Sequence, residues 1–128
     1  MNRLLFMGIV FVVLAGGSIS AHHSYAAYDR EHPVSIEGDI EQVAYENPHT
    51  VLTIRNATAD YTVEWGALFQ LQRWNVAQGT LKVGDHVIVT GSAWRDPSVR
   101  KLSIITDIRR PSDGWHWSRQ LQNPPQSR

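Results

Sequence analysis

The chain has 128 residues, enough for one domain, and its 12 Lys and Arg balance 12 Asp and Glu. A neutral chain is a poor candidate for nucleic-acid binding, because that binding depends on an excess of Lys and Arg. The chain contains no cysteine, so disulfides and thiolate metal sites are excluded. Any metal site must therefore use nitrogen and oxygen ligands.

Residues 1–21 have the pattern of a cleaved export signal. Arg3 supplies the positive charge, residues 4–17 are apolar, and small residues follow where cleavage is expected. The apolar segment is short for a membrane span, which needs about 20 residues, and an uncleaved anchor is the alternative. Cleavage removes one charged residue, Arg3, and keeps all six histidines. We therefore expect a periplasmic or secreted protein with no stable membrane span after cleavage.

The rest of the chain predicts five strands and one helix. Alternating apolar and polar residues indicate strands at 34–47, 49–55, 61–66, 86–94 and 101–110. Gly38 interrupts the first strand and predicts a bend or bulge, after which the alternation changes phase. Leu68 and Leu71 have helical spacing, which predicts a short helix over 67–76. Little periodicity follows Pro111, so an irregular tail is expected there.

Five short strands with a helix between the third and fourth predict an all-β fold, a small five-stranded OB-like Greek-key barrel. A bent first strand would help this barrel to close, and a five-stranded sandwich is the alternative. The expected organisation is a signal peptide over 1–21, a mature N-terminal segment with a double histidine over 22–33, the barrel over 34–110 and the irregular tail over 111–128.

His22 and His23 follow the export signal directly. Cleavage after Ser20 would leave the amine, two backbone amides and the His23 ring as four nitrogen donors, an arrangement that suits Cu(II) or Ni(II). Cleavage after Ala21 would make His22 terminal, and its amine and ring could chelate copper while a second histidine completes the site. The alternative is that both histidines are solvated and bind nothing.

A third histidine, His49, begins the second predicted strand. If the loop at 56–60 pairs Leu52 with Val63, then His49 lies diagonal to Glu64 on the more polar face, at roughly 7–8 Å. The two could bind a metal, or Glu64 could orient the imidazole. The alternative is a surface pair that contributes under about 1 kcal/mol.

Signals of catalysis are missing from the sequence. It has no G-x-S-x-G, no phosphate-binding glycine loop and no H-E-x-x-H, so we expect no enzyme activity. Asp29 is expected to be a turn or cap residue and is a distant candidate ligand. Weaker candidates than His49 are His32, His86 and His116.

Four motifs together resemble a family of small exported bacterial proteins catalogued as domain of unknown function 6152. They are AHHSYAAYD, ENPHT, VEWG and LKVGDHVIVTG, and the resemblance covers residues 21–110. It implies cleavage before His22, although this chain has Ile-Ser-Ala where members carry Ala-x-Ala. Where members begin the helix with a Ser-Pro-Asn-like turn, this chain has Ala-Leu-Phe. The resemblance emphasises certain positions and brings no established activity; these positions are His22, His23, Ser24, Asn47, Pro48, His49 and Glu64.

The sequence thus predicts a protein that binds a small ligand. The specific hypothesis is copper or a similar divalent metal ion at His22, His23 and His49, with Glu64 as an outer or occasional ligand. The alternative is a periplasmic adaptor that binds a protein or peptide through the face of the barrel. Neither hypothesis involves nucleic acid.

Overall fold

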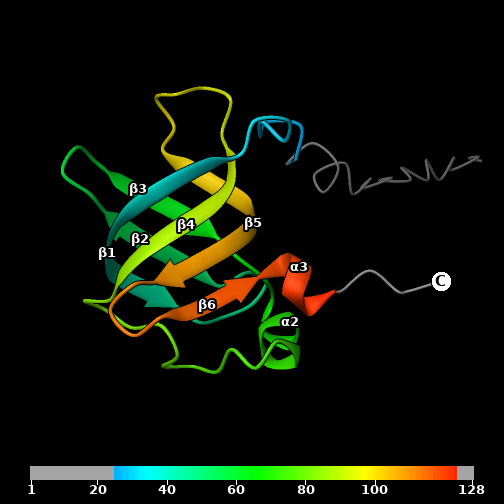
Figure 1. Ribbon diagram of the computed structural model, residues 1–128. Helices are drawn as coiled ribbons and strands as arrows, with labels where there is room; N and C mark the ends of the chain where they lie inside the picture. Colours follow the sequence, from blue (N-terminus) through cyan, green and yellow to red (C-terminus); the bar gives the residue numbers. More distant parts are fainter. Residues whose placement is uncertain (1–24, 124–128) are drawn as a thin grey trace, which may run out of the picture.

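The computed structural model describes residues 25–123, and a closed five-stranded barrel makes up most of them (Figure 1). The elements of the barrel are β1 (Val34–Ala44), β2 (Val51–Arg55), β3 (Asp60–Glu64), α2 (Leu68–Arg73), β4 (His86–Ala93) and β5 (Lys101–Arg110). β1 pairs with β2 and β4, β2 with β3, and β4 with β5, all antiparallel, while β3 closes the barrel by pairing in parallel with β5. This confirms the expected OB-like barrel and excludes the sandwich.

β1 takes part in two successive strand pairings, and it changes from one partner to the other beside Gly38. Its first half pairs with β4 and its second half with β2. A Cβ atom on Gly38 would lie within 3 Å of the carbonyl of Arg55, so the close approach requires glycine. The pairing also shifts between Ile40 and Gln42, which forms a bulge. Both the bend and the change of phase expected from the sequence are confirmed.

The barrel encloses one core of aliphatic and aromatic side chains. The strands supply residues that are at most 8% exposed, and Leu71 of α2 covers one end of the barrel. The ring of Trp65 lies edge-on to that of Trp117, with 5.1 Å between centroids. The buried strand residues are Ile36, Ile40, Leu52, Ile54, Val63, Val87, Val89, Leu102, Ile105 and Ile108.

The segment after Pro111 differs from the irregular tail that the sequence predicts. The strand β6 (Trp115–Ser118) pairs antiparallel with β5, and a short helix, α3 (Arg119–Gln122), follows it. Trp117 is 2% exposed and packs into the core. The turn before β6 is held by Arg110, which donates to the carboxylates of Asp85 and Asp113. The prediction is wrong for 115–122 because a single buried tryptophan fixes an element too short to show a period.

Replacing Trp117 with alanine tests whether β6 is part of the barrel core. We expect Trp117→Ala to lower the free energy of unfolding by about 3–5 kcal/mol, because it leaves a cavity beside Trp65. Urea unfolding followed by circular dichroism measures the change. Leu121→Ala, at a side chain that is 64% exposed, is the control and should have little effect. Equal effects of the two substitutions would contradict the packing of β6.

A second substitution tests the bend of β1. Gly38→Ala should lower the free energy of unfolding by about 1–3 kcal/mol, because the added methyl group meets the backbone of β2. The same urea experiment measures it, and Glu41→Ala, an exposed change in the same strand, is the control. A Gly38→Ala protein as stable as the control would show that β1 and β2 do not approach so closely.

Candidate functional site

Two adjoining hollows lie where the pairing of β3 with β5 ends. That pairing joins Thr62 to Lys101 and Val63 to Leu102, and the residues that follow in both strands line the hollows. Each hollow has a volume of about 290 Å³. Together we call them the seam hollow. Its Glu64 end is lined by Tyr25, Tyr28, His49, Glu64, Trp94, Lys101 and Ser103. Its Arg119 end is lined by Tyr25, Arg30, His49, Trp65, Gly66, Gln70, Ser103, Ile104, Ile105 and Arg119.

A bulge in β5 shapes one wall of the seam hollow. The register of β4 with β5 shifts between Thr90 and Ser92, where β5 carries two more residues than β4. Within this bulge Ile104 has a φ of 52°, a conformation that is strained for a β-branched residue. Neighbouring residues of a regular strand face opposite sides. The bulge allows three consecutive residues, 103–105, to line the hollow.

The N-terminal part of the described chain covers the Glu64 end. Tyr28 forms a backbone bridge with Trp94, and the two rings lie edge-on with 5.1 Å between centroids. The amide of Asp29 donates to the carbonyl of Ala93 at 2.8 Å. Both contacts hold the start of the chain against the end of β4. Tyr25 therefore lies at the seam hollow and lines both of its ends.

His49 and Glu64 come together as the strand register predicts. Leu52 lies opposite Val63, Val51 lies opposite Glu64, and His49 and Glu64 line the same end of the seam hollow. This confirms the register on which the His49–Glu64 hypothesis rests.

Glu64 has a partner that the sequence analysis missed. Its carboxylate accepts from the Nζ of Lys101 at 2.5 Å. This hydrogen bond raises the pKa of Lys101, and burial together with the charge of Glu64 raises the pKa of the Tyr28 hydroxyl. Lys101 also lies 5.7 Å from the centroid of the Trp94 ring. A cation would therefore have to displace Lys101 before it could use the carboxylate fully.

Hydrogen bonds connect the Asn-Pro-His turn, which carries His49, to the start of α2. The Oδ1 atom of Asn47 accepts from the amide of Leu68 at 3.1 Å, and Thr50 donates from its amide to the carbonyl of Gly66 at 2.9 Å. Asn47 thus satisfies an amide at the start of α2 from outside the helix. This contact supplies a side-chain acceptor at the start of a helix whose N-cap residue, Ala67, has none. It also gives a structural reason for Asn47, which the resemblance alone emphasised.

The remaining described histidines lie outside the seam hollow and pair with carboxylates. The ring nitrogens of His86 contact Asp39 at 2.6 Å and Glu37 at 2.9 Å on the exposed face of β1 and β4. The other two pairs are His32 with Asp29 and His116 with Asp107. Asp29 also accepts from two following backbone amides, which confirms it as a turn residue.

The described residues include only part of the expected metal site, His49 and Glu64. His22 and His23 lie outside the described residues. Within residues 25–123, no group of three or more His, Cys, Asp or Glu is arranged to hold a metal ion. A site that uses His49 would therefore need further ligands from the chain before Tyr25.

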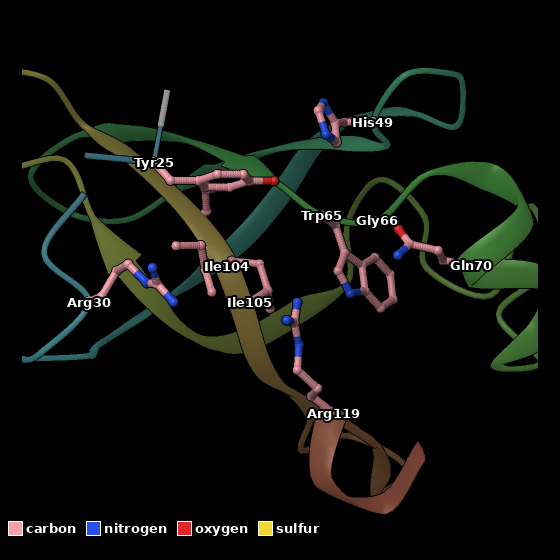
Figure 2. A pocket seen from close by; sticks show the side chains of 10 residues that line it. Tyr25, Arg30, His49, Trp65, Gly66, Gln70, Ile104, Ile105 and Arg119 are labelled. Carbon is pink, nitrogen blue, oxygen red and sulfur yellow. The ribbon is translucent and has the colours of Figure 1, made fainter. Parts of the chain in front are cut away.

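Several residues of the seam hollow are absent from the sequence predictions. Tyr25 falls within the AHHSYAAYD motif, so its neighbourhood was a signal. No sequence signal pointed to Lys101 or Arg119. The position of Lys101 depends on how β5 pairs with β3, and that of Arg119 depends on the packing of β6. Figure 2 shows Arg119 reaching from α3 toward Trp65, while Gln70 extends from α2 on the other side of the indole.

The chain belongs to a family of unknown function, DUF6152, whose model matches residues 10–103. The match includes the double histidine, the Asn-Pro-His turn and Glu64, and it ends before β6 and α3. Family membership confirms the resemblance and assigns no activity. No curated protein matches the chain. In the part of the chain that the structure describes, no helix is long and apolar enough to cross a membrane.

The His86 cluster predicts a pH-dependent contribution to stability. Hydrogen bonds to Glu37 and then Asp39 raise the pKa of His86 above 6.5, so its stabilisation is present below that pH and is lost as pH rises through the folded pKa. We expect His86→Gln to lower the free energy of unfolding at pH 5.5 by under about 1 kcal/mol, because the groups are exposed. The difference should shrink toward zero at pH 9.

Urea unfolding at several pH values measures this effect. In a Glu37→Gln/Asp39→Asn protein, the His86→Gln substitution should lose its pH dependence, because the two carboxylates are its cause. A larger destabilisation at pH 9 than at pH 5.5 would contradict the assignment.

Proposed function

We propose that the protein is exported and acts by binding a ligand, without catalytic activity of its own. The ligand is copper or a similar divalent metal ion, bound where the mature N-terminus meets the seam hollow. His22 supplies its amine and ring as a chelate, and His23 and His49 complete or support the site. The family match and the barrel are consistent with this proposal.

The observation that carries the proposal is the position of Tyr25. It lines the seam hollow together with His49. In the sequence His23 precedes Tyr25 by two positions and His22 by three. Successive Cα atoms are about 3.8 Å apart, so two steps of chain span at most about 7.6 Å and three at most about 11 Å. This short sequence separation from a residue that lines the hollow supports a site that joins the two histidines to His49.

The donor set agrees with the proposed metal. A terminal amine and imidazole rings are nitrogen donors, which copper binds well, and the chain has no thiolate that would favour another chemistry. A metal displaces the proton of an α-amino group near neutral pH because the pKa of that group is only about 8.

Glu64 fits a supporting role better than that of a primary ligand. Its ion pair with Lys101 places a balanced charge at that end of the hollow. In this arrangement Glu64 orients or electrostatically supports the ligands, as outer carboxylates do in many metal sites. It becomes a ligand only when Lys101 moves away.

The second candidate function is an adaptor for a periplasmic protein or peptide. Phe69 on α2 and Leu121 on α3 are 61% and 64% exposed, and both helices contribute to the Arg119 end of the seam hollow. Single exposed apolar side chains are common on protein surfaces. We therefore place this candidate after metal binding.

Calorimetric titration of Cu(II) into the mature protein tests the metal proposal. The cleavage point is first confirmed by intact mass. We expect one ion per chain, and we expect one added N-terminal glycine to weaken binding at least about tenfold, because the amine of His22 is displaced. His49→Ala should weaken it by about 10–100-fold if the barrel supports the site. His86→Gln, far along β4 from the hollow, is the matched control and should leave it unchanged.

Two results would contradict the proposal. One is an affinity no better than that of a peptide with the scrambled N-terminal sequence. The other is an affinity that the added glycine does not change. If His49→Ala alone has no effect, the chelate lies at the N-terminus alone, which contradicts the part of the proposal that joins it to the seam hollow.

A further inference from the structure

We propose that the Arg119 end of the seam hollow binds a small organic anion. Arg119 and the indole N–H of Trp65 hold its carboxylate or phosphate group, and its apolar part packs against Ile104 and Ile105. This site uses different residues and a ligand of opposite charge, so it goes beyond the proposed metal site.

The charged side chains described at the Arg119 end are basic, with no carboxylate among them. Its ten lining residues include Arg30, Arg119 and His49, and none of them is Asp or Glu. Across residues 25–123, neither Arg30 nor Arg119 forms an ion pair with a carboxylate. By contrast Arg110, on β5, pairs with Asp85 and Asp113. The positive charge of the Arg119 end is therefore not neutralised within the described chain.

A buried donor points to the same ligand. Trp65 is only 6% exposed, and its Nε1 atom is buried without a hydrogen-bond partner among the described residues. Figure 2 shows this nitrogen on the side of the ring that the guanidinium of Arg119 approaches. An indole N–H and a guanidinium can only donate hydrogen bonds. The two groups therefore cannot satisfy each other, and a shared acceptor would satisfy both.

Gln70 adds a third donor on the opposite side of Trp65. Its Oε1 atom accepts from the amide of Ala67 at 3.0 Å, so its amide nitrogen remains free to donate. In Figure 2 this nitrogen faces the indole of Trp65. Donors from α2, from Trp65 directly after β3, and from α3 thus line the same end of the hollow.

The donors and the volume together define the ligand class. A carboxylate or phosphate offers acceptors only, and a guanidinium binds either through two parallel hydrogen bonds. A hollow of about 290 Å³ holds about ten waters at roughly 30 Å³ each, which is more than a bare inorganic ion needs. Ile104, Ile105 and the Trp65 ring give it apolar walls, which favour an organic body behind the charged group.

The anion site and the proposed metal site are separable. Among the described residues, the Glu64 end contains a carboxylate, and the Arg119 end contains two arginines that form no ion pair within residues 25–123. Of the residues that the structure describes, Tyr25, His49 and Ser103 line both ends. Excess positive charge disfavours a metal ion at the Arg119 end and favours an anion there.

Binding of simple aromatic anions to metal-free protein tests the inference. The chain from residue 22 is dialysed against EDTA and titrated by calorimetry with benzoate, phenyl phosphate and the neutral analogue benzamide. We expect saturable binding of benzoate or phenyl phosphate, with benzamide at least tenfold weaker. The tighter of the two anions identifies the head group. Inorganic phosphate should bind more weakly than phenyl phosphate, because it has no apolar part.

Substitutions locate the site. Arg119→Gln should weaken binding of the anion at least tenfold, while Arg73→Gln, at an exposed arginine of α2 outside the seam hollow, should leave it unchanged. Trp65→Phe keeps an aromatic ring and removes the N–H, so it should weaken the anion about fivefold or more and leave benzamide unchanged. The added N-terminal glycine should have no effect, which separates this test from that of the metal.

The inference is overturned if neither anion binds, or if benzamide binds as well as benzoate. It is also overturned if Arg119→Gln behaves like Arg73→Gln. A normal circular dichroism spectrum and unfolding midpoint for Arg119→Gln, an exposed position, exclude misfolding as the cause of lost binding.

Discussion

The short parallel contact between β3 and β5 is the constraint on which the rest of the structure depends. It closes the barrel with two residue pairs, and just past them Glu64 binds Lys101 at 2.5 Å. Beyond this ion pair the two strands no longer pair, and the bulge at Ile104 turns β5 away from a regular ladder. The same closure that completes the core therefore creates the seam hollow at its end.

The elements outside the barrel gather around this opening. The chain from Tyr25 covers one end of the seam hollow, and α2 and α3 contribute Gln70 and Arg119 to the other. Figure 1 shows both helices on the same side of the barrel. The two ends differ in charge, because a carboxylate paired with Lys101 lies at one, and two arginines without an ion pair among residues 25–123 lie at the other. The same hollow can thus bind a metal ion at one end and an organic anion at the other, each through different residues.

The barrel was predictable because apolar and polar residues alternate in β1 and β3, and because β2, β4 and β5 are rich in β-branched residues. Sliding β2 against β3 by one residue would bury Glu64. That register also placed His49 near Glu64 without any structure. The closure was not predictable, since no local pattern shows that Lys101 meets Glu64. β6 is too short to show a period, and nothing in the β-branched sequence of β5 indicates the positive φ of Ile104. Arg119 could not be recognised for the same reason, because β6 positions it.

The central claim is that the mature N-terminus and the seam hollow form one binding region. Substoichiometric Cu(II), added to isotope-labelled mature protein, tests it most directly through paramagnetic broadening of backbone amide signals. The account predicts broadening at His49, Trp65 and Ser103, with the signals of His86 and Asp60 unchanged. Broadening confined to the residues before Tyr25, or centred on His86, would contradict it.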